Sequence, residues 1–352
     1  MEIDLNYTNY KNLILSVESK IEDAILNLNN SGMRIVLVVD INNKLMGTIT
    51  DGDIRRGLLQ GCVLSDNVMK ITNLNPIKVI EKISRSDILM LMEKSGHGQI
   101  PCVDINDNLL GLFIEKSKKE LKYLEHTLVI MAGGKGTRLH PVTVNLPKPL
   151  IQINEKPILQ HIIEMALDQG IKHFVLVINY LGNLIQEYFG DGSRFGAKIE
   201  YVVENKPLGT AGGLSKIVIK NDNPLIVING DILTSINFRD LIDFHNKQQG
   251  VATMAVRQHI IENPFGVIES EDFQLKQYIE KPVYKSIINA GIYVLDHHVL
   301  ELIKDETYID MPELFQIALD YGMKISIFPL HENWIDIGNP SDLGKVIAGM
   351  TK

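Results

Sequence analysis

The chain has 352 residues, 45% hydrophobic and 22% charged, which is typical of a globular protein long enough for two domains. Its 35 Lys and Arg against 43 Asp and Glu give a net charge of −8, which argues against a nucleic-acid or anionic-membrane surface. Two cysteines, Cys62 and Cys102, are too few for a disulfide framework, and the first residues do not resemble a signal peptide, so we expect a soluble cytoplasmic protein.

Residues 1–118 show one pattern twice, at a period of roughly 65 residues. The first copy predicts a helix from Ile21 and strands at 34–40 and 45–50; the second predicts a helix from Ser86 and strands at 99–104 and 109–114. Each copy has the order β-α-β-β-α. Paired copies of this kind resemble a tandem CBS-domain pair (α+β), a regulatory module that binds adenine nucleotides in many proteins. The resemblance therefore implies an adenine or guanine nucleotide effector, or a role in dimerisation.

The first copy carries a candidate ligand pair at Thr50 and Asp53, within Gly47–Asp53. The Thr50 hydroxyl can meet a phosphate at a helix N-terminus, and the Asp53 carboxylate can accept hydrogen bonds from ribose hydroxyls. The same two residues also suit a helix cap, so both interpretations stay open. The matching segment of the second copy, residues 111–117, has neither group, which predicts at most one ligand site.

Residues 119–126 overlap a charged stretch, 115–125, in which Lys116 and Glu120 have i,i+4 spacing. We expect a solvated linker helix here, between a first domain at 1–118 and a second at 127–352.

The second domain begins with LVIMAGGKGTRLHPVTVNLPKPL, residues 128–150. A buried strand from Thr127 to Ala132 runs into glycines whose exposed N–H groups attract anions. Arg138 offers a planar fork for phosphate oxygens, and Lys148 is carried on a stiff segment between two prolines. The spacing fits neither the P-loop nor the dinucleotide fingerprint. This loop predicts a site for several phosphate groups.

The loop resembles the signature of the sugar-1-phosphate nucleotidyltransferases, also called NDP-sugar pyrophosphorylases. The resemblance implies an NTP and a sugar 1-phosphate as partners and a homo-oligomer, either a dimer or a tetramer. It assigns Arg138, Lys148 and Lys281 to catalysis. It places Ala132, Gly133, Gly134, Glu204, Gly209 and Thr210 around the nucleotide.

Strands and helices alternate after the loop. We predict strands at 174–178, 199–203 and 225–228, and helices at 158–169, at 184–189 and after Gly209. This alternation predicts an α/β, Rossmann-like domain with a mixed, mostly parallel sheet. Short strands at 251–257, 266–269, 275–279 and 288–295 predict antiparallel additions that flank a sugar site.

Glu204 follows a predicted strand and precedes a run of small residues. A carboxylate only accepts hydrogen bonds, so it suits guanine, whose N1–H and N2–H₂ edge donates two. The thymidylyltransferases of the family generally carry glutamine here, and glutamate is similar to the guanylyltransferases.

Asp231 ends the buried strand before it, and Asp336 lies in a second motif much further along the chain. Mg²⁺ favours one or two carboxylates together with phosphate oxygens. In the family, the matching pair of aspartates holds the metal, so Mg²⁺ is the expected cofactor. A turn aspartate that caps the following segment is the alternative for each.

The segment Tyr278–Pro282 resembles the E-K-P motif of the family, which implies that Lys281 holds the sugar phosphate and Glu280 accepts from sugar hydroxyls or an amine. Asn289 is expected to contact sugar hydroxyls, and Gly266 to let the sugar ring lie close. An exposed ion pair is the alternative for Glu280 and Lys281.

The CBS pair and Glu204 together resemble the guanylyltransferases of the legionaminic acid pathway, which use glucosamine 1-phosphate. Mannose 1-phosphate guanylyl transfer is the close alternative, and glucose 1-phosphate thymidylyl or uridylyl transfer is more distant. Two alternatives come from other classes of protein. A non-catalytic nucleotide sensor would not need the full set of charged residues, which is Arg138, Lys148, Asp231, Lys281 and Asp336. An NAD-linked dehydrogenase would carry the dinucleotide fingerprint, which this sequence does not match.

Overall fold

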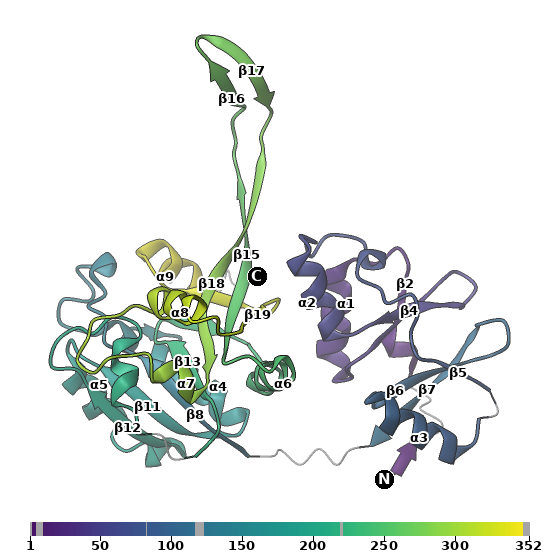
Figure 1. The fold of residues 1–352 in the computed structure, drawn as a ribbon, viewed down its shortest axis with the longest axis horizontal. Coiled ribbons are helices and arrows are strands. Elements are labelled where there is room, and N and C mark those ends of the chain that lie inside the picture. Colours follow the sequence, from purple (N-terminus) through teal and green to yellow (C-terminus); the bar gives the residue numbers. More distant parts are fainter. Residues whose placement is uncertain (1, 5–9, 82, 117–122, 219–220, 348–352) are drawn as a thin grey trace. The chain divides into compact units, whose positions relative to one another are not determined.

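The computed structural model describes residues 2–4, 10–81, 83–116, 123–218 and 221–347 (Figure 1). The chain divides into two compact units, Met1–Glu120 and Leu121–Lys352. No helix within the described ranges is long and apolar enough to cross a membrane.

The first unit contains the predicted repeat. Its first copy comprises β2 (Ile14–Ser16), α1 (Ile21–Ser31), β3 (Val36–Val39), β4 (Leu45–Ile49) and α2 (Asp51–Leu59); its second comprises β5 (Val79–Ile80), α3 (Arg85–Ser95), β6 (Gln99–Val103) and β7 (Leu109–Lys116). In each copy the first strand is parallel to the second, and the second is antiparallel to the third. A short strand, β1 (Glu2–Asp4), pairs with β7. Equal pairing in both copies confirms the repeat, and the last helix predicted for the second copy lies outside the described residues.

The predicted linker helix is wrong at both ends. Glu115 and Lys116 lie in β7, where Lys116 pairs with Glu2, and Leu124 and Glu125 begin β8 (Leu124–Met131). Strand pairing supplies backbone hydrogen bonds that the weak i,i+4 attraction between charged side chains does not outweigh. The central part of the predicted helix, residues 117–122, falls outside the described residues.

The second unit is built on a seven-stranded sheet with the order β12-β11-β8-β13-β18-β15-β19. The strands are β8, β11 (Ile171–Ile178), β12 (Lys198–Val203), β13 (Leu225–Asn229), β15 (Ala252–Glu262), β18 (Val283–Leu295) and β19 (Ile325–Pro329). The first four in the order are mutually parallel, and β18 is antiparallel to both of its neighbours. The expected mixed, mostly parallel sheet is therefore confirmed.

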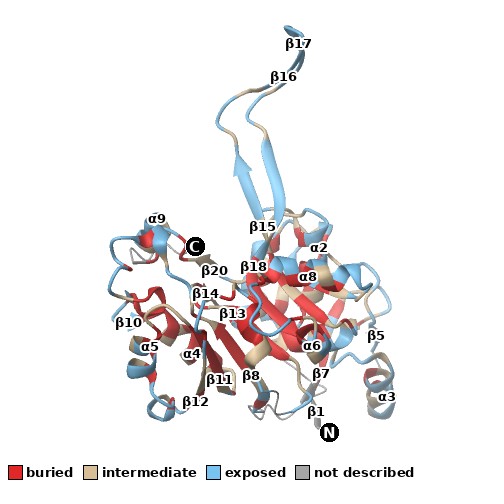
Figure 2. Cartoon of the chain, turned by 60° about the vertical axis from the view of Figure 1, so that its left-hand side comes forward, coloured by how far each residue is buried: buried red, intermediate tan, exposed pale blue. Residues whose placement is uncertain are grey.

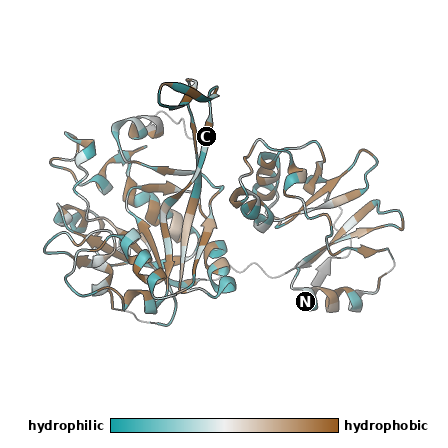
Figure 3. Cartoon of the chain, turned by 45° about the horizontal axis from the view of Figure 1, so that its top comes forward, coloured by the Kyte–Doolittle hydropathy of each residue, from teal (hydrophilic) through white to brown (hydrophobic). Residues whose placement is uncertain are grey.

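Helices cover both faces of this sheet. Residues alternate along β8, so that Leu128 and Ile130 belong to one buried cluster and Val129 to another. The first cluster is completed by α4 (Ile158–Asp168), α5 (Gly182–Phe189), α6 (Phe238–Gln248) and α9 (Pro340–Ile347), and the second by α7 (His297–Leu300) and α8 (Met311–Asp320). Figure 3 shows the apolar strands running through the middle of this unit.

Short elements connect these parts. The 3₁₀ helices are η1 (Tyr10–Leu13), η2 (Val68–Lys70), η3 (Thr137–Leu139), η4 (Lys148–Leu150), η5 (Ser193–Phe195) and η6 (Gly212–Lys216). The small strands β9 (Gln152–Ile153) and β10 (Lys156–Pro157) pair with each other, as do β14 (Ile232–Thr234) and β20 (Trp334–Asp336).

The helix predicted after Gly209 is only the 3₁₀ helix η6. Gly209 has a φ of 82°, and a Cβ atom there would lie 2.4 Å from the carbonyl oxygen of Ile309. The glycines that follow favour close packing of backbone against backbone over a regular helix.

Two strands of the sheet continue beyond it as a long two-stranded arm, which we define as residues 258–289 (Figure 1). The arm consists of the outer parts of β15 and β18 and, at its tip, of the hairpin β16 (Val267–Glu271) and β17 (Gln274–Ile279). Figure 2 shows that the arm is exposed over most of its length. The antiparallel strands predicted after Asp231 are thus present, but their outer parts project from the unit.

Candidate active site

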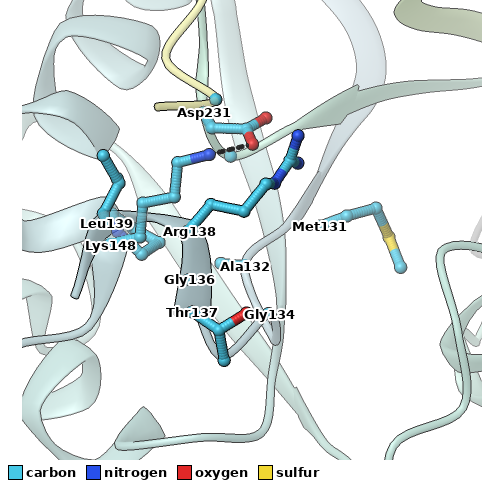
Figure 4. Close-up of a pocket in the computed structure, with 12 residues that line it drawn as sticks. Met131, Ala132, Gly134, Gly136, Thr137, Arg138, Leu139, Lys148 and Asp231 are labelled. Atoms are coloured by element: carbon cyan, nitrogen blue, oxygen red, sulfur yellow. Dashed lines mark hydrogen bonds and ion pairs between the residues drawn. The ribbon is translucent and has the colours of Figure 1, made fainter. Parts of the chain in front are cut away.

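A cavity of about 220 Å³ opens where β8 and β13 end. Its lining combines backbone of the glycine-rich loop with charged side chains (Figure 4). The lining residues include Met131, Ala132, Gly134, Gly136, Arg138, Lys148, Gly230, Asp231 and Gly338. The carboxyl ends of parallel strands are where ligands bind in sheets of this type.

The loop takes a tight course that brings two of its cations, Arg138 and Lys148, to the cavity. Gly136 has a φ of 61°, and a Cβ there would lie 3.1 Å from the Thr143 side chain and 3.2 Å from that of Lys148. Thr143 is fully buried, and its hydroxyl donates to the carbonyl of Gly136 at 2.8 Å. The 3₁₀ turns η3 and η4 then present Arg138 and Lys148 at the cavity.

Lys148 is 9% exposed and forms an ion pair with Asp231. Figure 4 shows the side chains of Arg138 and Lys148 pointing toward Asp231. A buried ammonium of this kind needs a partner, because an isolated charge in the interior is costly. The pairing holds both side chains in place at the cavity wall.

Asp336 joins this group through the pairing of β14 with β20. Ile232 lies opposite Asp336, and the N–H of Ile337 donates to the carbonyl of Asp231 at 3.1 Å. A Cβ on Gly338 would lie 3.5 Å from Asp336 Oδ1 and 3.6 Å from an Arg138 nitrogen. Two carboxylates distant in the sequence are therefore neighbours, with Arg138 beside them.

Burial and the negative charge of Asp231 raise the pKa of Asp336, while Lys148 and Arg138 oppose the shift. Asp336 Oδ1 is buried, and no described residue hydrogen-bonds to it. A buried carboxylate oxygen without a partner is costly. A divalent cation between Asp231 and Asp336 would supply the missing partner, and two carboxylates with phosphate oxygens suit Mg²⁺. The residues present therefore fit the metal.

Glu204 lies behind the glycine loop. A Cβ on Gly133 would lie 3.3 Å from Glu204 Oε2, and one on Gly213 would lie 2.6 Å from Glu204 Oε1. Burial raises the pKa of Glu204, against a hydrogen bond from the Leu208 N–H and the nearby charge of Lys216. Its Oε1 is buried and has no hydrogen-bond partner in the described part of the chain. Like Asp336 Oδ1, Glu204 Oε1 is thus a buried acceptor near the loop to which no described residue donates a hydrogen bond.

Gly209 and Thr210 have a structural task in this conformation. The backbone N–H of Thr210 donates to Asp310 at 2.9 Å, and its hydroxyl accepts from the N–H of Met311 at 2.8 Å. Together with the close approach of Gly209 to Ile309, these bonds fix the chain before α8. Neither residue lines the cavity.

The four predicted sugar-site residues are not at the cavity either. Asn289 lies at the base of the arm, where its amide donates to the Tyr293 hydroxyl at 2.7 Å and its Oδ1 accepts from the Gly291 N–H at 2.9 Å. Gly266, Glu280 and Lys281 lie further out, beside the breaks between the two pairs of strands. An extended strand advances about 3.3 Å per residue, so Val283 is roughly 20 Å from Asn289. The arm as it stands keeps Lys281 out of reach of its own cavity.

In the first unit, Thr50 and Asp53 bond to each other. The Thr50 hydroxyl donates to Asp53 at 2.6 Å, its backbone N–H donates to the same oxygen at 2.8 Å, and Asp53 also pairs with Arg56. These contacts correspond to the capping alternative, with Thr50 as the N-cap of α2.

Sequence reasoning missed three residues at this centre. Asn179 directly follows β11, and its amide donates to the carbonyl of Glu204 at 2.7 Å. Gly213 leaves the space into which Glu204 fits, and Gly338 lines the cavity next to Asp336 and Arg138. Asn179 had a readable signal, because a polar residue directly after a buried parallel strand faces the ligand edge. The role of Gly213 depends on how its segment packs against Val177 and Glu204, which only the folded chain shows.

A mixed α/β sheet with a glycine loop, two cations and two carboxylates at the carboxyl ends of its strands defines a protein of the phosphate-binding α/β class. The comparison with family models agrees with this class. The chain belongs to the nucleotidyl transferase family, whose model matches residues 127–352, and a CBS domain model matches residues 7–60.

Among curated proteins, the chain is similar to mannose-1-phosphate guanyltransferases of Debaryomyces hansenii (34% identity over 226 residues) and Pichia angusta (35% over 234 residues). These alignments cover 61% and 63% of this chain, and 61% and 62% of the relatives, so the chain matches less than two thirds of their length. Among solved structures, HddC from Yersinia pseudotuberculosis is 27% identical with a TM-score of 0.51, covering 64% of this chain and 99% of that one. The same protein has been solved with GMP-PN.

Proposed function

We propose that this protein transfers a guanylyl group from GTP to a sugar 1-phosphate and releases pyrophosphate. The observation that carries the proposal is that Arg138, Lys148 and Asp231 line one cavity beside a glycine-rich loop. Asp336 lies next to Asp231, just outside that lining. Phosphoryl-type transfer requires little covalent chemistry from a protein, so positioning and charge neutralisation suffice.

Each group has a separate task in this proposal. The backbone N–H groups of Gly133 and Gly134 hold the triphosphate, and Ala132 leaves it room. Arg138 neutralises phosphate oxygens with its planar fork, and Lys148 turns from Asp231 to the departing pyrophosphate. The sugar phosphate oxygen attacks the α-phosphorus directly, and no side chain acts as a nucleophile.

Asp231 and Asp336 would hold Mg²⁺ in this scheme. When bound, the ion supplies positive charge to the reacting phosphates. The unpartnered Asp336 Oδ1 and its neighbour Asp231 support this assignment.

The preference for GTP rests on Glu204. Its free Oε1 is suited to accept from the N1–H and N2–H₂ edge of guanine, and the burial that raises its pKa makes a donor especially favourable there. The guanyltransferases among the relatives and the GMP-PN complex of HddC support the same base.

Two sugar phosphates compete as substrate. The fusion of a CBS module to the transferase, with Glu204, favours glucosamine 1-phosphate and a place in legionaminic acid or other surface-glycan synthesis. The curated relatives favour mannose 1-phosphate. Glucose 1-phosphate with TTP or UTP is the remaining alternative.

Lys281 and Glu280 keep their proposed roles on the sugar phosphate, with Gly266 and Asn289 beside the ring. These roles require that the outer part of an arm lies over a cavity, either that of its own copy or that of another one. Residues 1–118 are proposed to form a CBS pair that regulates a transferase domain at 127–352, with a purine nucleotide at Thr50 and Asp53, in a cytoplasmic oligomer.

Purified full-length protein, incubated with each NTP and each sugar 1-phosphate in separate reactions, tests the proposal by release of pyrophosphate. We expect turnover with GTP and Mg²⁺, and none without either. A clear preference for TTP over GTP would overturn the role of Glu204. Binding of GTP without turnover on any sugar phosphate would favour the nucleotide sensor instead.

A further inference from the structure

The arm exposes more apolar surface than its own unit covers. Ten large apolar side chains of residues 258–289 are between 42% and 110% exposed: Ile260, Ile261, Phe265, Ile268, Phe273, Leu275, Tyr278, Val283, Tyr284 and Ile287. Together they expose on the order of 1,000 Å², whereas the largest apolar patch of a typical monomer is about 300–600 Å².

Both faces of the arm contribute to this surface. In the register of β15 and β18, Gln258 lies opposite Ile287 and Ile260 opposite Lys285, while Ile261 lies opposite Tyr284. Adjacent residues point to opposite faces of a strand, so Ile260 and Ile261 cannot both turn inward. An isolated two-stranded ribbon is marginally stable in water, and a covering partner supplies the missing burial.

The charges of the arm are divided between its two strands. The outgoing half, residues 258–272, contains Glu262, Glu269, Glu271 and Asp272 and no lysine or arginine. The returning half, residues 273–289, contains Lys276, Lys281 and Lys285 and a single acid, Glu280. One long strand of the ribbon is therefore acidic and the other basic.

We propose that the arm is the docking surface for a second copy of this chain, arm against arm. The face that carries Ile260, Val283 and Ile287 packs against the same face of the second copy. A two-fold axis along the arms then sets the acidic strand of each copy over the basic strand of the other. The same patch then serves both copies, as a two-fold interface requires. The charge pattern selects the register, and the apolar side chains between the charges supply most of the contact.

Strand pairing alone does not identify an occupant, because both edges of the arm offer free backbone groups to any extended segment. The division of charge does. An unrelated acidic or basic peptide matches only one of the two strands, whereas a second arm matches both.

The test uses the full chain with Ile260→Glu and Ile287→Glu together, which puts two carboxylates on one face of the arm. Leu319→Glu is the control, since Leu319 is 53% exposed on α8, away from the arm. Sedimentation velocity over a dilution series measures the dissociation constant of the dimer, and circular dichroism checks folding. We expect the double variant to weaken self-association at least 100-fold and the control to leave it unchanged.

Cross-linking places the contact on the arm. Val283 lies opposite Glu262 in the strand register, on the same face as Ile260 and Ile287. Val283→Cys in a Cys62→Ser, Cys102→Ser background is expected to give covalent dimers with a short bismaleimide, and Leu319→Cys to give none. The proposal is overturned if the wild-type protein stays monomeric throughout the dilution series, if the double variant associates as the wild type does, or if Val283→Cys gives no cross-link. These readouts measure association only, so they are independent of whether the proposed guanylyl transfer occurs.

Discussion

Asp231 with Asp336 and Thr50 with Asp53 are both pairs of oxygen-bearing side chains, but their surroundings differ. In the first unit the Thr50 hydroxyl and backbone N–H both donate to Asp53, which also pairs with Arg56. In the second unit, Asp336 keeps a buried oxygen for which the described residues offer no donor, and its pKa is raised. A satisfied pair stabilises the fold without any ligand, whereas an unsatisfied pair is stabilised by one.

The largest effect is expected from Asp336→Asn, which removes a charge proposed to hold Mg²⁺. We expect guanylyl transfer to fall at least 10³-fold, as measured by pyrophosphate release. Asp243→Asn, at an exposed position of α6, is the control and should change the rate less than about threefold. Retention of more than a tenth of the rate by Asp336→Asn would remove Asp336 from the site.

Asp336→Asn also tests, through the stability of the fold, whether the Asp336 carboxylate is unsatisfied. Because the folded-state pKa of Asp336 is raised, ionisation favours the unfolded chain, and this loss of stability grows as the pH rises through that pKa. We therefore expect Asp336→Asn to raise the melting temperature by roughly 2 °C at pH 7.5 without metal. The difference should vanish below pH of about 4, where aspartate is protonated in both states. A lower melting temperature at pH 7.5 would contradict the unsatisfied carboxylate.

Lys148→Ala tests the cation that pairs with Asp231. We expect the rate to fall about 10²–10³-fold with the protein still folded, because the variant loses charge neutralisation at the departing pyrophosphate. Lys135→Ala, in the same loop but outside the cavity lining, is the matched control and should stay within about fivefold. Equal losses in both variants would indicate a general effect of loop charge.

Glu204→Gln tests the base. An amide donates as well as accepts, so it fits guanine less well and uracil or thymine better. We expect kcat/KM for GTP to fall about 10-fold or more relative to that for UTP or TTP. Glu187→Gln, on the exposed side of α5, should leave the ratio unchanged. An unaltered preference in Glu204→Gln would place base selection elsewhere.

The smallest effect is expected from Thr50→Ala. Loss of the N-cap of α2 should lower the free energy of unfolding by about 1 kcal/mol, measured with urea. Ser84→Ala is the matched control, since the Ser84 hydroxyl oxygen accepts from the Asp87 N–H at 3.2 Å as the N-cap of α3. If calorimetry shows that Thr50→Ala also abolishes binding of ATP, ADP or GTP while Ser84→Ala does not, Thr50 has a ligand role besides the cap.

The sequence predicted the local parts of the molecule well. The repeat in the first unit, the alternating strands and helices of the second, and the loop with Arg138 and Lys148 all follow from periodicity and from glycine and proline over short distances. Those features depend on neighbours in the chain, so a single sequence contains their causes. The pairing of Asp231 with Asp336 required the family resemblance, because no local pattern connects them.

Only the tertiary structure decided the rest. Strand pairing with Glu2 replaced the expected helix at Lys116, and close packing against Ile309 shortened the one after Gly209. The sequence around Lys281 is compatible both with strands that fold over a cavity and with strands that project as an arm. The strand pattern predicts which residues pair, but it does not predict the direction of the ribbon beyond its sheet. Direction is set by what covers the ribbon, and that depends on contacts between distant segments or between copies of the chain.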